Sequence, residues 1–146
     1  MKQPHDIELA TGVRTAVSRL VKKIRSETSF LTQLSLTEHI TMSSLYTHSQ
    51  CLPSELSKMG KVSSQAMSQI LNHLSDLKYL TRKASKEDKR KTIVSITEKG
   101  KRFINQSRLE KQEWLAKAIR ETLTRDEKKT LAEAIALLIK IADFED

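Results

Sequence analysis

The segment of residues 78–102 constrains the fold most, because two strand-like runs in it flank a charged connection. Thr92–Ile96 is β-branched apart from Ser95 and, with Leu80–Ala84, is predicted to form a β-hairpin. The segment contains ten basic and three acidic residues, so its formal charge is +7. A solvated surface is one explanation of this charge. Its concentration on a single hairpin favours binding to a polyanion.

The helix predicted just before the hairpin, Ser63–Leu77, has two different faces. Residues at helical spacing form an apolar inner stripe: Ala66, Met67, Ile70, Leu71, Leu74 and Leu77. The outer face carries hydroxyl and amide groups where solvent-facing helices usually carry Lys and Glu: Ser63, Ser64, Gln65, Ser68, Gln69 and Asn72. Such groups can form hydrogen bonds with base edges in a DNA groove. Helix and hairpin together predict a protein that binds duplex DNA through base and phosphate contacts. The alternative is that the polar side of the helix is an ordinary solvent-exposed face.

The composition limits the core and the class of protein. The chain has 146 residues, a formal charge of +8, 38% hydrophobic residues and 4% aromatic residues, which predicts a thin core completed by a partner subunit. Cys51 is the single cysteine, so no internal disulfide can form, and a buried structural thiol is expected. The N-terminus lacks the apolar stretch of a secretion signal, and the longest apolar run near the C-terminus is too short for a bilayer. A cytoplasmic protein without a membrane partner is therefore expected.

The remainder of the chain is predicted to be helical. The expected helices are Ile7 to about Thr28, a helix from Thr41 (or from a cap at Thr37) to about Ser49, Pro53–Met59, Thr97 toward Leu123, and a last helix from Thr124. This order predicts a mainly α fold with a small β wing. Its parts are an N-terminal dimerisation helix in residues 1–35, a winged helix-turn-helix DNA-binding domain in 36–100, and C-terminal dimerisation helices in 101–146. The outer helices have apolar faces without a sheet to cover, so a two-fold dimer is expected to bury them.

The chain resembles the MarR family of bacterial transcription regulators over nearly its whole length. The matching motifs are Pro53-Ser54-Glu55-Leu56, Val62–Ser68, Leu74 with Lys78-Tyr79-Leu80 and Arg82, Asp88-Lys89-Arg90, Val94–Gly100, and Leu123-Thr124 with Glu127 and Leu131. The spacing between the polar helix and the wing pattern makes the resemblance specific, since each motif alone is weak.

The resemblance implies a homodimer with one winged helix on each flank, which acts as a repressor on a short inverted repeat. Each polar helix would enter a major groove, and each wing tip would reach the adjacent minor groove. Members of this family are often released from DNA by a small molecule or an oxidant. Such an effector would bind where the first two helices meet the winged helix, near Thr41–Tyr46, although no residue identifies it. No cofactor or metal is expected.

The chain departs from the family pattern in several places. Lys78 stands where the family commonly has Gly at the end of the recognition helix, so either a left-handed non-glycine residue costs roughly 1 kcal/mol or the helix ends differently. Gln69 stands where many members carry Arg, which affects the preferred base. The first helix lacks the Cys of the redox-sensing branch, and the ligand cluster of the zinc-sensing branch cannot be assembled.

Candidate DNA contacts come from both elements. Arg90 at the wing tip is expected to enter the minor groove, with Asp88 on the same side of a strand orienting its guanidinium. Lys86, Lys89 and Lys91 are expected to contact phosphates or steer DNA, or only to aid solubility. Ser63, Ser64, Gln65, Ser68, Gln69 and Asn72 are candidates for base or phosphate contacts. Because Gln and Asn pair bidentately with adenine, an A·T-rich half-site is expected. His73 and Ser75 are expected to be wet bystanders.

Three other functions compete with this one. A nucleic-acid binder without operator specificity, chromatin-like or directed at RNA, is the main alternative, although only Tyr46 and Tyr79 could stack on bases. A purely helical interaction module leaves the charge of the hairpin unexplained. An enzyme is not expected, because the three glycines are isolated and no nucleophile–base set can be assembled.

Overall fold

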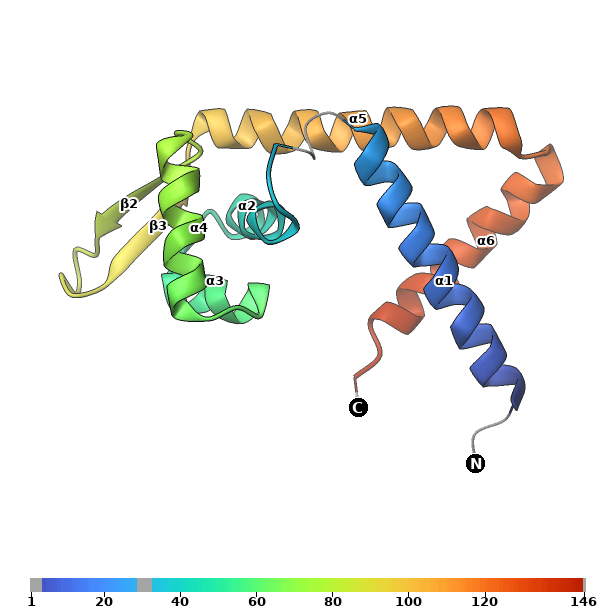
Figure 1. Cartoon of the computed structure of the whole chain (residues 1–146), viewed down its shortest axis with the longest axis horizontal. Coiled ribbons are helices and arrows are strands. Elements are labelled where there is room, and N and C mark those ends of the chain that lie inside the picture. The colour runs from blue at the N-terminus through green and yellow to red at the C-terminus, as the bar shows by residue number, and fades with distance from the viewer. Residues whose placement is uncertain (1–3, 29–32, 146) are drawn as a thin grey trace. The chain divides into compact units, whose positions relative to one another are not determined.

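The computed structural model describes residues 4–28 and 33–145 (Figure 1). Its elements are α1 (Pro4–Glu27), α2 (Leu36–His48), β1 (Gln50–Cys51), α3 (Pro53–Gly60), α4 (Ser64–Asp76), β2 (Leu80–Ala84), β3 (Thr92–Ile96), α5 (Glu98–Thr122) and α6 (Arg125–Ala142). The chain divides into two compact units, residues 1–111 and 112–146. The first unit holds a winged helix-turn-helix, which confirms the predicted mainly α fold with a small β wing.

The sheet of the wing has three antiparallel strands in the order β1-β3-β2. In the hairpin, Leu80 pairs with Ile96 and Ala84 pairs with Thr92, so both predicted strands are confirmed over their full lengths. The two-residue strand β1 pairs with the other edge of β3 through Cys51 and Val94. The central strand is therefore paired on both sides, which fixes the hairpin to the helical part of the domain.

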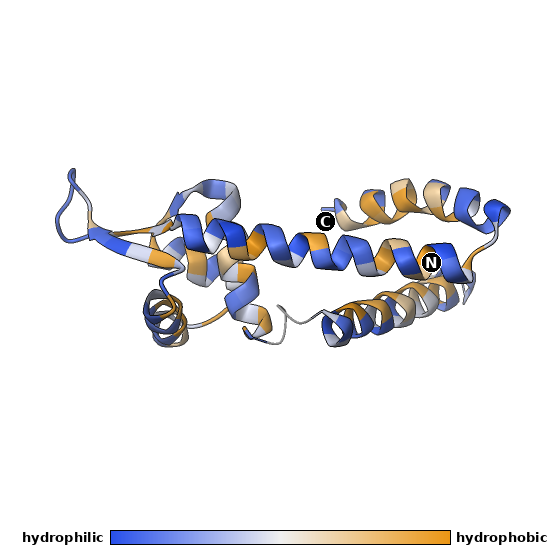
Figure 2. Cartoon of the chain, turned by 90° about the horizontal axis from the view of Figure 1, so that it is seen from above, coloured by the Kyte–Doolittle hydropathy of each residue, from blue (hydrophilic) through white to orange (hydrophobic). Residues whose placement is uncertain are grey.

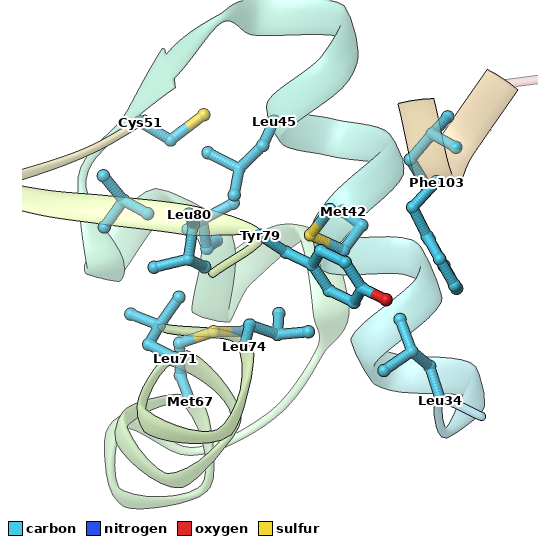
Figure 3. Packing of buried hydrophobic residues seen from close by; sticks show 13 residues of the cluster. Leu34, Met42, Leu45, Cys51, Met67, Leu71, Leu74, Tyr79, Leu80 and Phe103 are labelled. Carbon is cyan, nitrogen blue, oxygen red and sulfur yellow. The ribbon is translucent and has the colours of Figure 1, made fainter. Parts of the chain in front are cut away.

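The core lies between the helices and the inner face of this sheet (Figure 3). It takes Met67, Leu71 and Leu74 from α4, as the apolar stripe predicts. The rings of Tyr79 and Phe103 pack with their centroids 4.7 Å apart, which joins the start of the wing to α5. The recognition helix is thus held along its whole inner face.

The start of α2 differs from the sequence-based prediction. Neither Thr41 nor Thr37 begins the helix; Ser35 caps it, and Ser35 Oγ accepts a hydrogen bond of 3.2 Å from Glu38 N. Glu38 Oε2 accepts a second bond of 2.8 Å from Ser35 N, which completes a capping box. The capping-box pattern Ser-x-x-Glu is present in the sequence at Ser35 to Glu38. The apolar stripe of this helix is too weak to indicate that the helix begins there.

Two helices end at lysines in left-handed conformation. Lys61, with φ of 51° and ψ of 46°, follows α3, so the turn after this helix uses the lysine and not Gly60, the last residue of the helix. Lys78, which stands where the family commonly has Gly, has φ of 65°. It therefore adopts the left-handed conformation without being a glycine, as the first of the two alternatives above states.

Apolar residues on the terminal helices are exposed in the single chain, and Figure 2 shows apolar positions recurring along α6. On α1 they are Ile7, Leu9, Val17, Leu20 and Val21; on α6 they are Ile135, Leu137, Leu138, Ile139 and Ile141. Neither helix has a residue that is buried within the described chain. No described helix is both long enough and apolar enough to span a membrane.

Candidate nucleic-acid interface

The outer face of α4 presents the predicted hydroxyl and amide groups to solvent. Ser63 caps the helix, because its Oγ accepts a 3.1 Å hydrogen bond from Ala66 N. Ser68 Oγ donates to the carbonyl of Ser64 at 3.0 Å. The whole predicted set is exposed: Ser63, Ser64, Gln65, Ser68, Gln69 and Asn72. The face can therefore meet another molecule without rearrangement of the core.

The wing tip is a tight turn that ends the hairpin. Ser85 N donates to Lys91 O at 2.8 Å, and Lys91 N donates to Asp88 O at 2.9 Å. Ser85 Oγ accepts hydrogen bonds of 3.3 Å from the amides of Glu87 and Asp88. These bonds hold the connection in one shape.

Arg90 and Asp88 form a contact within this turn. Asp88 Oδ1 accepts from Arg90 N at 3.1 Å and from Arg90 Nε at 3.2 Å. The predicted partnership is present, but the two residues lie in a turn and not on a strand, because β3 begins only at Thr92. The Arg90 side chain is 91% exposed, so its other N–H groups remain available. The three tip lysines, Lys86, Lys89 and Lys91, are exposed as well, and Figure 2 shows a hydrophilic tip.

The structure adds two cations that were not among the predicted contacts. Arg82 on β2 reaches α4, where its Nη1 donates to Asn72 Oδ1 at 2.7 Å. Arg82 and Lys83 also line a hollow of about 430 Å³ between the wing and α4, together with Ser68 and Thr92. Arg82 belongs to one of the sequence motifs, but only the folded hairpin shows that it touches the recognition helix.

The base of the wing is tied to the end of α4 by side chains that follow β3. Thr97 Oγ1 donates to Lys78 O at 2.6 Å, and Lys99 Nζ donates to Leu77 O at 3.0 Å. These bonds satisfy carbonyls that the end of a helix leaves unpaired. Helix and wing therefore present their exposed groups as one surface.

A second tie joins α4 to α2. His73 is exposed, as predicted, but its Nδ1 also contacts Glu38 Oε1, so it links the two helices. Burial raises the pKa of the Glu38 carboxyl, but hydrogen bonds from His73 and from Ser35 outweigh it and bring the pKa below the usual 4.5. The carboxylate serves both the capping box and the recognition helix.

A pocket of about 470 Å³ lies in the first unit, in the region where a resemblance-based effector site was expected. Its lining is Val21, Ile24, Arg25, Leu36, His39, Ile40, Ser43, Ser44, Thr47, His48 and Lys111. His39 is 6% exposed, and its Nε2 has no hydrogen-bond partner among the described residues. Burial, with Lys111 and Arg25 nearby, lowers the pKa of His39 to about 4. At neutral pH the pocket thus holds a neutral imidazole beside two cations.

The residues considered for redox chemistry and for base stacking lie in the packed part of the domain. Cys51 is buried, as predicted, and burial together with Glu55 raises the pKa of its thiol. Tyr79 is buried and Tyr46 lies under the Arg108 guanidinium at 4.4 Å, so neither ring is displayed for base stacking. Within residues 4–28 and 33–145, no three His, Cys, Asp or Glu side chains converge as metal ligands would.

Comparison with known proteins agrees with this geometry. A sequence profile of the MarR family matches residues 32–91. The uncharacterized HTH-type transcriptional regulator YwhA of Bacillus subtilis is 30% identical over 94 residues, which cover 64% of this chain and 67% of YwhA. The chain belongs to the MarR family. Its relatives also include the HTH-type transcriptional regulator MT0903.1 of Mycobacterium tuberculosis, 28% identical over 138 residues, or 94% of this chain and 95% of the relative.

Solved structures extend the likeness over the whole fold. A protein of Pseudomonas aeruginosa PA01 assigned as a transcriptional regulator superposes with a TM-score of 0.86 and 26% identity, covering 99% of this chain and 100% of that one. A point mutant of S. aureus MepR, solved bound to an oligodeoxyribonucleotide, has a TM-score of 0.70 at 16% identity and covers 92% of this chain and 98% of its own. This MarR protein is thus a winged-helix transcriptional regulator, and its relatives are regulators and not enzymes.

Proposed function

We propose that the protein is a homodimeric, sequence-specific repressor that acts in the cytoplasm on an inverted-repeat operator. In each subunit α4 enters a major groove, and Arg90 enters the neighbouring minor groove. The observation that carries the proposal is the uncharged hydrogen-bonding face of α4 fixed beside a cationic wing. The MepR mutant bound to an oligodeoxyribonucleotide has the same fold, which supports DNA as the partner.

The dimer is assigned to the terminal segments, residues 1–35 and 101–146. The exposed apolar residues of α1 and α6 support it, because such surfaces are normally covered in soluble proteins. Two α4 helices related by a two-fold axis would meet half-sites about one helical turn apart, roughly 34–36 Å.

The test is a mobility-shift titration of an operator selected from random duplex DNA. Arg90→Ala is expected to weaken operator binding at least about tenfold while the dimer stays folded, because the minor-groove contact is lost. Lys128→Ala on α6 removes an exposed cation far along the chain and serves as the control. An unchanged affinity for Arg90→Ala would refute the wing assignment. Equal binding to operator and random duplex at physiological salt would favour the non-specific binder instead.

The pocket supports release by a small organic anion. Its walls combine apolar side chains with Arg25 and Lys111, and the Nε2 of His39 is left without a partner among the described residues. A molecule with an apolar body and one acidic group would satisfy both kinds of wall. The fluorescent anion anilinonaphthalene sulfonate is a suitable probe. We expect the probe to bind the protein, to lower its affinity for the operator, and to bind more weakly to Lys111→Met. If neither Lys111→Met nor Ile40→Glu changes the affinity for the probe, the probe binds outside this pocket.

A further inference from the structure

Three carboxamide side chains share the outward stripe of α4. Gln65, Gln69 and Asn72 follow one another at intervals of four and three residues, so they lie on one face. In the described part of the chain, neither Gln65 nor Gln69 makes a side-chain hydrogen bond. Asn72 differs, because Arg82 Nη1 lies 2.7 Å from its Oδ1.

The chemistry of Arg82 determines how the Asn72 amide is oriented. A guanidinium carries only N–H donors, so the amide atom that faces it must be the oxygen. A charge-assisted bond of this length strongly favours that orientation over the flipped one. Asn72 therefore directs its NH₂ group, with two donors, away from Arg82. The two residues together present mainly hydrogen-bond donors at the junction of recognition helix and wing.

This orientation changes which base Asn72 can read. Bidentate pairing with adenine requires the amide oxygen to accept from N6–H₂ while the amide nitrogen donates to N7. In this protein Arg82 already engages one of the two lone pairs of that oxygen, and its guanidinium occupies the space beside it, which disfavours a second bond from adenine. Guanine offers two acceptors, O6 and N7, at the same edge of the major groove. Gln65 and Gln69 keep free amides and remain suited to adenine.

We propose that Arg82 sets the base preference of Asn72, so that the third turn of α4 selects guanine and not adenine. The inference rests on the proposed function, since it assumes that α4 lies in the major groove. It also revises the A·T-rich half-site expected from the amide residues alone. Asn72 is the reading residue, and Arg82 is a positioning residue that acts through it.

The experiment is selection from a random duplex library with the full-length wild type, Arg82→Met and Asn72→Ala, followed by titration of single base-pair variants of the selected site. The wild type is expected to prefer guanine over adenine at one position by at least about fivefold, the scale of one good base contact. Arg82→Met frees the amide oxygen and should shift that position toward adenine. Asn72→Ala should lose the preference.

Lys83→Met is the matched control. Lys83 is the next residue on β2 and carries the same charge, but within the described residues it makes no hydrogen bond with Asn72. It should weaken binding to all sequences alike and reduce the salt dependence, without shifting any base preference. Thermal melts verify that each variant is folded.

Four outcomes would overturn the inference. The first is a wild type that selects adenine at every position, and the second is an Arg82→Met preference identical to that of the wild type. The third is guanine retained by Asn72→Ala, which would mean that Arg82 itself or a phosphate contact is responsible. If the wild type selects no sequence at all, the proposed function fails and this inference with it; the first three outcomes leave the proposed function intact.

Discussion

His39 is the residue whose surroundings change its chemistry most. It is buried, it faces the cations Lys111 and Arg25, and its pKa of about 4 lies well below the usual 6.5. As the pH falls from 6.5 to 4, His39 becomes protonated in the unfolded chain but stays largely neutral in the folded chain. The folded state therefore loses stability in that window.

The prediction is a loss approaching about 3 kcal/mol between pH 6.5 and pH 4, on the scale of 1.36 kcal/mol per pKa unit. Urea unfolding at a series of pH values measures it. In His39→Leu, which fills the space without a titratable ring, this part of the pH dependence should disappear. Parallel curves for the two proteins would show that the pKa of His39 is the same in the folded and the unfolded chain.

Gly100 provides a second test at the residue scale. A Cβ at this position would stand 2.3 Å from Tyr79 O and 2.8 Å from Ile96 Cγ1, and the first of these atoms is backbone. Gly100→Ala should destabilise the protein by at least about 2 kcal/mol, because the start of α5 must move off the wing. Gly12→Ala is the control, since nothing lies within 4 Å of its added carbon. Equal melting temperatures for Gly100→Ala and the wild type would contradict the packing described above.

Single residues show where prediction from sequence ends. Arg90 and the amide residues of α4 could be assigned because their exposure follows from a turn and from helical periodicity. The Arg82–Asn72 contact, the His73–Glu38 contact and the burial of Tyr79 could not. Each depends on how separate elements pack, and a single sequence does not contain that information. The conformation of Lys78 was open for the same reason, because its φ depends on how the chain enters the wing.

Among the elements, α2 packs against α3, α4, β1 and β3. Its Glu38 closes the capping box with Ser35 and also holds His73 of α4. The lowered pKa of Glu38 means that this contribution to stability is present above pH 4.5 and is lost as the pH falls below that value.

Glu38→Gln separates the two roles of this carboxylate, since Gln also closes a capping box but carries no charge for His73. We expect a loss of about 1 kcal/mol at neutral pH that shrinks below pH 4.5, measured by chemical denaturation. Glu55→Gln is the matched control, because Glu55 Oε2 accepts from Leu52 N at 2.9 Å at the start of α3 in the same manner. Equal effects of the two substitutions would mean that the contact with His73 contributes nothing.

The elements themselves were largely predictable. Both hairpin strands and the recognition helix follow from β-branched runs, a cap and a clear apolar stripe. The predicted start of α2 was wrong by five residues at Thr41 and by two residues with a cap at Thr37. Ser43 and Ser44 interrupt the apolar stripe of the helix, so the stripe does not indicate the stronger capping signal at Ser35. Strand β1 is two residues long and exists only because β3 has an open edge to pair with.

At the scale of the whole molecule, the proposed function depends on assembly as a dimer. The apolar residues of α1 and α6 are suited to contact a second subunit, and one winged helix alone would hold DNA at a single half-site. Linked half-sites raise affinity far beyond that of either alone.

Leu20→Glu and Ile135→Glu should each give a monomer in sedimentation, because a buried unpaired charge destabilises an apolar interface. Operator affinity should fall at least about a hundredfold with the loss of the second half-site. Lys129→Glu changes charge on an exposed part of α6 and is expected to leave the dimer intact. Dimers that persist in both apolar variants would exclude these helices from the interface.

The two faces of α2 contact different parts of the domain, the pocket on one side and the recognition helix on the other. Its pocket-lining residues, among them Leu36, Ile40 and Ser43, share one face of the helix, and Glu38 lies on the nearly opposite face against His73. A molecule in the pocket that displaces α2 would thus bias the reading helix without touching DNA. Thermodynamic reciprocity then requires that bound operator weaken the molecule's own affinity by the same factor.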